Sequence, residues 1–259
     1  MIAAYLEGTP MDFERHCAEI VTQTELLAEG VAGADLTATV PSCPEWSLGG
    51  LLRHLGGAHA WIEEIARTRA QEPVPDPSRD VRGDDSGEPP VAWLLDGATR
   101  LATSIRDGGA DTTVWTPLAP MPLSFFARRM AHETLVHRAD AMLAAGREFV
   151  AGPEVVTDAI DEWMELDALP QHFEYNPAKR DLLGPGRTLS FRATDADVAW
   201  HVDLTGEAIV NGRGRHDAAV TVEAPLTELL LIIYRRQEPV GVTGDADLLA
   251  FWSKHVTFG

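Results

Sequence analysis

The apolar residues of this chain change their spacing near residue 150, and this change limits the folds that the chain can adopt. Before that point they recur at steps of three and four residues, which is the spacing of amphipathic helices. After it, short alternating segments are separated by Gly, Asp and Asn, which is the pattern of strands joined by tight turns. The change of period indicates a helical part followed by a part that contains a sheet.

The first part is expected to contain four helices. The periodic segments cover residues 11–31, 48–70, 91–107 and 124–146. Ser47 is placed to cap the start of the second helix, and Gly146 suits the end of the fourth. A loop rich in Pro, Gly and Asp, residues 71–90, joins the second helix to the third. Four helices with one long connection predict a four-helix bundle over residues 1–150.

The rest of the chain is expected to form a small α+β domain. Residues 153–166 continue the helical spacing, so a connecting helix is expected over 151–167. The next segments, TLSFRAT, DVAWHVDLT, EAIVNG and AAVTVEA, predict a meander of short strands. They are followed by two helical patterns, PLTELLLIIYRR and DADLLAFWSKHV. Strands followed by helices predict an α+β domain over residues 168–259.

The charge of the chain excludes several classes of partner. The formal net charge is −19, whereas nucleic-acid binding requires clustered cations. An acidic chain is also not expected on an anionic membrane surface. The sequence shows neither the start of a signal peptide nor a run of about 18 apolar residues, so we expect a cytoplasmic protein without a membrane span. Small molecules are the expected partners, and a monomer is the default expectation.

The segment HETLVHRAD, residues 132–140, contains the candidate metal ligands. It differs by one residue from the zinc-protease pattern H-E-x-x-H. Because helical residues advance by about 100° each, His132 and His137 point about 140° apart and cannot bind one ion. Glu133 and His137 are four residues apart and lie within about 40° of each other. The protease interpretation therefore fails, and Glu133 with His137 is the usable pair.

This pair offers one carboxylate oxygen and one imidazole nitrogen, which suit Zn²⁺ or a related divalent ion. A catalytic metal needs a third ligand from a facing helix. His54 lies on the flank of the apolar face of the second helix, whereas His59, five residues on, faces elsewhere. Asp140 follows His137 by three residues and could orient its imidazole. The alternative is an ordinary surface pair of Glu133 with His137, which contributes only tenths of a kcal/mol.

Two segments, CPEWSLGGLLRHLGGAHAW and later HETLVHRADAMLAAG, resemble the maleylpyruvate isomerase N-terminal family. These are actinobacterial, mycothiol-dependent metalloenzymes within the DinB-like superfamily of four-helix bundles. The segment LLLIIYRRQEPVGVTGDADLLAFW resembles the small α/β, sterol-carrier-like domain that accompanies the bundle. The resemblance implies a divalent metal, usually zinc, bound by His54, Glu133 and His137.

The resemblance also implies a functional arginine from the second domain. Arg236 in IIYRRQ is the best match, and Arg235 precedes it directly. This sequence departs from the family there, because relatives usually carry a glycine before the arginine, so the choice between Arg235 and Arg236 stays open. The alternative is a cation that caps the last turn of a helix.

The activity that the resemblance implies is the activation of mycothiol. A metal with three protein ligands keeps an open position, where a bound thiol is deprotonated and can attack an electrophilic carbon. Arg236, with or without Arg235, would hold a substrate carboxylate or stabilise an enolate. The product is either a cis–trans isomer or an S-transferase adduct, and the sequence does not choose between them. The alternatives are a non-catalytic module for small ligands and a metal-dependent hydrolase that uses metal-bound water with His59 or His132 as the base.

Overall fold

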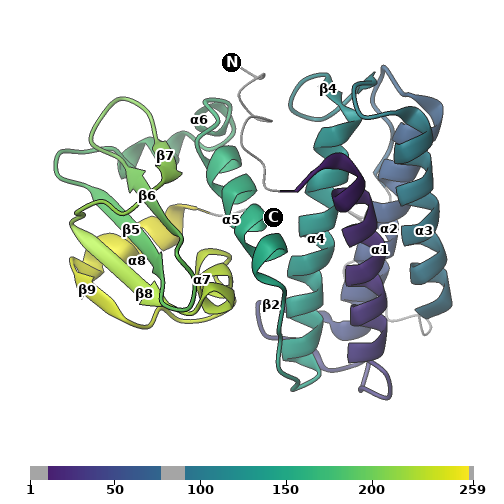
Figure 1. Ribbon diagram of the computed structural model, residues 1–259, viewed down its shortest axis with the longest axis horizontal. Coiled ribbons are helices and arrows are strands. Elements are labelled where there is room, and N and C mark those ends of the chain that lie inside the picture. The colour runs from purple at the N-terminus through teal and green to yellow at the C-terminus, as the bar shows by residue number, and fades with distance from the viewer. Residues whose placement is uncertain (1–10, 77–90, 257–259) are drawn as a thin grey trace. The chain divides into compact units, whose positions relative to one another are not determined.

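The computed structural model describes residues 11–76 and 91–256, which fall into two compact units (Figure 1). The first unit covers residues 11–149 and is helical apart from two short hairpins. The second unit covers the described residues from 150 on and contains a five-stranded sheet with helices. The fold class predicted from the change of period, a helical bundle followed by an α+β part, is confirmed.

The first unit is a bundle of four helices, α1 (Phe13–Gly30), α2 (Leu48–Thr68), α3 (Val91–Gly108) and α4 (Leu123–Ala144). They bury the apolar faces that the sequence predicts, including Ile20 of α1, Leu55 of α2 and Leu101 of α3. The Ser47 hydroxyl accepts a hydrogen bond from the backbone N–H of Gly50, so Ser47 is the predicted N-cap. Gly146 has a φ of +64° directly after α4, in the left-handed region that glycine adopts at helix ends.

Two short hairpins complete this unit, and the sequence did not indicate either of them. The first pairs β1 (Thr39–Val40) with β2 (Cys43–Ser47), and the second pairs β3 (Thr113–Val114) with β4 (Met121–Pro122). The segment PSCPEWS, residues 41–47, has the Pro and Ser residues typical of a turn, but most of it is strand β2. Strands of two residues are too short to show an alternating pattern. The β1–β2 hairpin packs against α2 and α4, the two helices that carry the candidate ligands.

The sheet of the second unit has the order β7-β6-β5-β8-β9. Its strands are β5 (Thr188–Ala193), β6 (Ala199–Asp203), β7 (Val210–Arg213), β8 (Val220–Ala224) and β9 (Val242–Gly244). The predicted simple meander is wrong, because β8 pairs with β5, and the two run parallel. Turn residues show where strands end but not which strands pair. Strand β5 buries Leu189, Ser190 and Phe191 in succession, as expected of a central strand with neighbours on both sides.

Helices and one 3₁₀ segment surround this sheet: α5 (Pro153–Asp167), α6 (His172–Tyr175), η3 (Pro177–Leu182), α7 (Leu226–Ile233) and α8 (Ala246–His255). A buried ion pair joins two of them, since Lys179 Nζ lies 2.5 Å from Asp167 Oδ1. Burial raises the pKa of Asp167, and the charge of Lys179 opposes that shift. The Asn211 amide donates to the backbone oxygen of Met164 at 2.8 Å, so the end of α5 is tied to strand β7 as well.

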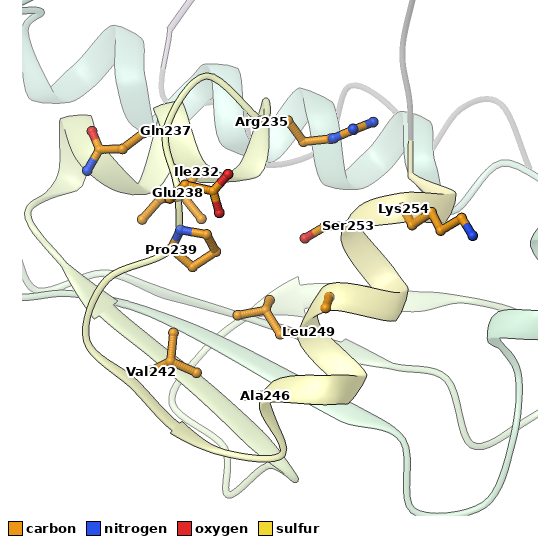
Figure 2. A pocket seen from close by; sticks show the side chains of 11 residues that line it. Ile232, Arg235, Gln237, Glu238, Pro239, Val242, Ala246, Leu249, Ser253 and Lys254 are labelled. Atoms are coloured by element: carbon orange, nitrogen blue, oxygen red, sulfur yellow. The ribbon is translucent and has the colours of Figure 1, made fainter.

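A cavity of about 460 Å³ opens in the second unit between the turn after α7 and helix α8 (Figure 2). Ile232, Val242 and Leu249 give it an apolar lining. Figure 2 shows the Ser253 side chain turned into the cavity, and the charged residues Arg235, Glu238 and Lys254 also line it. None of the helices in residues 11–76 and 91–256 is both long and apolar enough to cross a membrane.

Candidate metal centre

The structure brings His54 of α2 together with Glu133 and His137 of α4. One ligand atom from each of the three side chains lies within 4.8 Å of the other two. His137 Nε2 and Glu133 Oε1 are 3.1 Å apart, as expected for two residues one helical turn apart. The rings of His54 and His137 approach edge to face, with centroids 5.1 Å apart. Packing of α2 against α4 therefore supplies the third donor that one helix could not offer.

This donor set fits a divalent cation of the zinc type. Two imidazole nitrogens and one carboxylate oxygen are common zinc ligands, and three protein ligands leave a position open. Tetrahedral ligands at bond lengths of about 2.0–2.1 Å lie about 3.3 Å from each other. The 3.1 Å between His137 Nε2 and Glu133 Oε1 is close to that spacing. Glu133 and His54 are partly exposed and the His137 side chain keeps 11% exposure, so an ion and a further ligand have access from solvent.

Asp140 fixes the orientation of the His137 ring. Its Oδ2 lies 3.1 Å from His137 Nδ1, and its Oδ1 accepts a 2.5 Å hydrogen bond from the Ser42 hydroxyl. Asp140 is fully buried, so the carboxylate has little freedom to move. A carboxylate on Nδ1 holds the proton on that nitrogen and leaves Nε2 free to bind a metal.

Arg129 is a neighbour of the site that the sequence reasoning missed. Its Nη2 lies 2.9 Å from Glu133 Oε2, while Glu133 Oε1 faces His137. Burial raises the pKa of Glu133, but the hydrogen bond with His137 and the charge of Arg129 outweigh it and hold the pKa below its usual range. Glu133 is therefore ionised at neutral pH. The signal was available, because Arg129 precedes Glu133 by four residues on the same helix.

His137 has a raised pKa in the metal-free site. Burial lowers the pKa of its imidazole, but hydrogen bonds with Asp140 and Glu133 outweigh burial and raise the pKa to about 9. At neutral pH the ring without a bound cation therefore carries protons on both nitrogens and is positively charged. A metal can bind Nε2 only after that proton leaves, so metal binding is expected to strengthen as the pH rises toward 9.

The other two histidines near this site have different partners. His59 Nε2 lies 3.0 Å from the Thr134 hydroxyl, which itself donates to the backbone oxygen of Met130 at 2.7 Å. The hydroxyl proton is used, so His59 must donate from Nε2. His132 lies edge to face with His16 of α1, with ring centroids 5.9 Å apart. Both rings are fully buried, and neither belongs to the cluster of His54, Glu133 and His137 that a hydrolytic base would have to serve.

His59 should make stability depend on pH. Burial is the main reason that its pKa is lowered to about 3. In the unfolded chain the pKa of His59 is about 6.5, so below that pH unfolded His59 takes up a proton that folded His59 does not. The free energy of unfolding therefore falls as the pH falls. We expect the free energy of unfolding of the wild type, relative to His59→Gln, to drop by about 2 kcal/mol from pH 7 to pH 5. Urea unfolding of both proteins with a chelator present measures this change. A difference in the free energy of unfolding that does not vary with pH would contradict the prediction.

Arg235 and Arg236 belong to the second unit, where α7 ends. The backbone N–H of Arg235 donates to Ile232 at 3.0 Å, and that of Arg236 donates to Leu231 at 2.6 Å. These two bonds form a Schellman motif with Arg235 at the position where glycine is preferred. Arg235 has a φ of +62°, in the left-handed region, and its side chain is exposed. Arg236 is half-buried, and its Nη1 donates to the backbone oxygen of Tyr234 at 2.7 Å.

Comparison with known proteins gives one family and one fold. Residues 17–142 match the sequence profile of the mycothiol maleylpyruvate isomerase N-terminal domain. No curated protein sequence matches the chain. A crystal structure of the mycothiol-dependent maleylpyruvate isomerase superposes with a TM-score of 0.62 at 14% identity, covering 90% of this chain and 92% of that one. A histidine-to-alanine mutant of a mycothiol-dependent maleylpyruvate isomerase superposes with a TM-score of 0.59 at 13% identity, with the same coverage.

The matched residues include α2 and α4 and therefore all three candidate ligands. The structural similarity extends over both units, at an identity that shows the fold alone. Residues 17–142 thus belong to the mycothiol maleylpyruvate isomerase N-terminal domain family, and the chain as a whole has the fold of the mycothiol-dependent maleylpyruvate isomerase.

Proposed function

We propose that this chain is a metal-dependent enzyme that uses mycothiol to transform a small electrophilic substrate. Maleylpyruvate, which gives the similar enzymes their name, is the first candidate substrate. The observation that carries the proposal is the cluster of His54, Glu133 and His137, whose ligand atoms lie within 4.8 Å of one another inside the matched domain. A set of two nitrogens and one oxygen that is open to solvent is the arrangement of catalytic zinc sites.

A divalent cation at these three residues would supply a Lewis acid that lowers the pKa of a thiol bound to it. Neighbouring residues set the orientation and the protonation of the candidate ligands. Arg129 holds Oε2 of Glu133 and directs Oε1 toward the histidines. Asp140 keeps the proton of His137 on Nδ1. His137 gives up its second proton to solvent when a cation binds, and Glu133 has none to lose, because its pKa is already low.

Arg236 is proposed as the residue that binds the carboxylate of the substrate. Members of the resembling family carry a glycine before their functional arginine. Arg235 has a φ of +62° at the C-terminal cap of α7, which is the conformation that favours glycine. Arg235 therefore takes the place of the glycine, and Arg236 takes the place of the arginine. A guanidinium can bind a carboxylate through two parallel hydrogen bonds.

Substitutions of the two arginines should have different effects. We expect Arg235→Gly to leave turnover unchanged and to stabilise the protein by about 0.5–1 kcal/mol. The change removes left-handed strain of about 1–2 kcal/mol, and the backbone entropy that glycine adds to the unfolded chain offsets part of this gain. We expect Arg236→Ala to raise KM for a carboxylate substrate about 10- to 100-fold, as for loss of a hydrogen-bonded charge. Urea unfolding and steady-state kinetics measure these effects. The reverse pattern would assign the substrate to Arg235.

The thiol step is tested by binding before any substrate is known. Titration of zinc-loaded protein with mycothiol, followed by calorimetry, should show binding with release of a proton at neutral pH. The S-methyl ether of mycothiol is the matched control, because it keeps the sugar groups but has no proton to lose. Binding that is equal for both ligands, or that survives removal of the metal, would contradict the proposal and favour a non-catalytic module.

The products separate the two possible outcomes of the reaction. In an isomerisation the thiol adds to a conjugated double bond, and that bond becomes single and rotates. The thiol then leaves as the double bond re-forms, so no mycothiol is consumed. In an S-transfer the adduct is the product, and one mycothiol disappears per substrate. Incubation with maleylpyruvate, with counting of the remaining thiol, distinguishes catalytic from stoichiometric use.

A further inference from the structure

The β1–β2 hairpin contacts two of the three candidate ligands, directly or through one residue. Ser42, in the two-residue turn between the strands, donates its hydroxyl proton to Asp140, which holds His137 of α4. Trp46 of β2 lies edge to face with His54 of α2, with ring centroids 4.6 Å apart. This hairpin of nine residues, Thr39 to Ser47, therefore contacts His54 of α2 directly and His137 of α4 through Asp140.

Ser42 matters because Asp140 is fully buried. A buried carboxylate needs a hydrogen-bond donor on each oxygen, and loss of one donor costs the free energy of desolvation. His137 Nδ1 lies 3.1 Å from Oδ2, and the Ser42 hydroxyl donates to Oδ1 at 2.5 Å. Without the hydroxyl, Oδ1 loses this hydrogen bond, and we expect the hold of Asp140 on the His137 ring to weaken.

Trp46 acts on His54 by packing alone. Its half-buried ring contacts the apolar cluster around Leu48, Leu51 and Leu55, so its position is fixed by the core of the bundle. The edge of such a ring limits the rotation of the His54 imidazole. His54 is partly exposed, so loss of this contact removes one restraint on the orientation of its ring toward Glu133 and His137.

We propose that the β1–β2 hairpin is a positioning element for the metal centre, with Ser42 and Trp46 as positioning residues. This inference rests on the proposed metal-dependent function. Ser42 sets the orientation of His137 through Asp140, and Trp46 sets that of His54. The hairpin thereby keeps the rings of His54 and His137 oriented toward one shared cation position before a cation binds.

The test is the affinity for Co²⁺ and its visible spectrum, which reports the geometry of the ligands without any substrate. Competition with a chromophoric chelator should show Ser42→Ala binding Co²⁺ about tenfold more weakly, as for other partners of metal ligands. Ser42→Thr retains a hydroxyl and should restore the affinity to within threefold. Thr39→Ala, at an exposed hydroxyl residue of the same hairpin, is the matched control and should bind as the wild type.

Trp46 provides the second arm of the test. We expect Trp46→Ala to weaken Co²⁺ binding several-fold and to broaden its visible spectrum, while Trp46→Phe retains an aromatic edge and restores both. Circular dichroism and urea unfolding show whether each variant is folded under the conditions of the titration. The Ser42 and Trp46 arms are independent, so an unfolded alanine variant in one arm leaves the other arm as the test.

The outcomes separate this inference from the proposed function. Equal Co²⁺ affinity and spectrum in the wild type, Ser42→Ala and Trp46→Ala would overturn the positioning role and leave the metal centre intact. Failure of Ser42→Thr and Trp46→Phe to restore binding would show that the hairpin matters only for folding. A wild type that binds neither Co²⁺ nor Zn²⁺ would overturn the metal centre and this inference together.

Discussion

Replacing His54 by alanine should weaken zinc binding several hundredfold. The apparent binding free energy of four-ligand zinc sites is about 10–16 kcal/mol, or roughly 2.5–4 kcal/mol for each ligand. A difference of about 1.4 kcal/mol corresponds to a factor of ten in affinity. His54 is the candidate ligand that α2 contributes to this cluster, so its loss leaves the candidates Glu133 and His137 of α4. Competition with a chelator of known affinity measures the change, and elemental analysis of the purified protein gives the metal content.

His59→Gln is the matched control for this experiment. It removes a histidine from the same helix, five residues from His54, but that histidine is held by Thr134. We expect its zinc affinity to stay within about threefold of the wild type. Glu133→Gln keeps the shape of a second ligand but removes its charge, and it should bind zinc as weakly as His54→Ala. Full zinc content in both His54→Ala and Glu133→Gln would show that the metal is bound elsewhere.

Replacing Lys179 by methionine should destabilise the second unit by about 3–5 kcal/mol, the usual effect of removing one partner of a buried ion pair. Lys179 and Asp167 are both buried, at 3% and 1% exposure, so the carboxylate that remains cannot be solvated by water. Methionine has nearly the length of lysine, so the loss comes from the charge and not from a large cavity. Urea unfolding at pH 7, followed by tryptophan fluorescence, measures it.

Lys254→Met is the natural control, because Lys254 is the other lysine of this chain and is exposed on α8. Loss of this exposed charge should change the free energy of unfolding by less than about 0.5 kcal/mol. The double variant Lys179→Met with Asp167→Asn should regain much of the lost stability, since it leaves no unpaired charge. A loss in the double variant as large as in Lys179→Met would contradict the role of the ion pair.

Much of the candidate metal site could be predicted from the sequence, because helical geometry is local. The angle between residues of one helix follows from their separation, and this arithmetic selects Glu133 with His137 and excludes His132. The choice of His54 needed the position of that residue on the flank of an apolar face, together with the family resemblance. Arg129 could have been found by the same arithmetic. Ser42 and Trp46 could not, because a short hairpin has no periodic signal.

Helix α4 shows the limit of amphipathic patterns. Its apolar residues do not form one stripe, and it buries Arg128, His132, Arg138 and Asp140 along with them. Periodicity predicted the length of this helix but not which of its polar side chains would be buried. Those side chains are stabilised by partners from distant segments, such as Ser42 on Asp140, and a sequence pattern carries no information about such partners.

The sequence by itself determined where the longer helices and the strands β5–β8 lie, the change from bundle to sheet, and the two candidate ligands on α4. These features depend on residues a few positions apart, and the geometry of a helix or strand fixes the direction of such neighbouring side chains. The tertiary structure alone decided that β5 and β8 pair in parallel and that the hairpin reaches Asp140 and His54. It also gave Arg235 its left-handed backbone. Such features depend on contacts between segments tens of residues apart or on how a helix ends, which only packing of the whole chain selects.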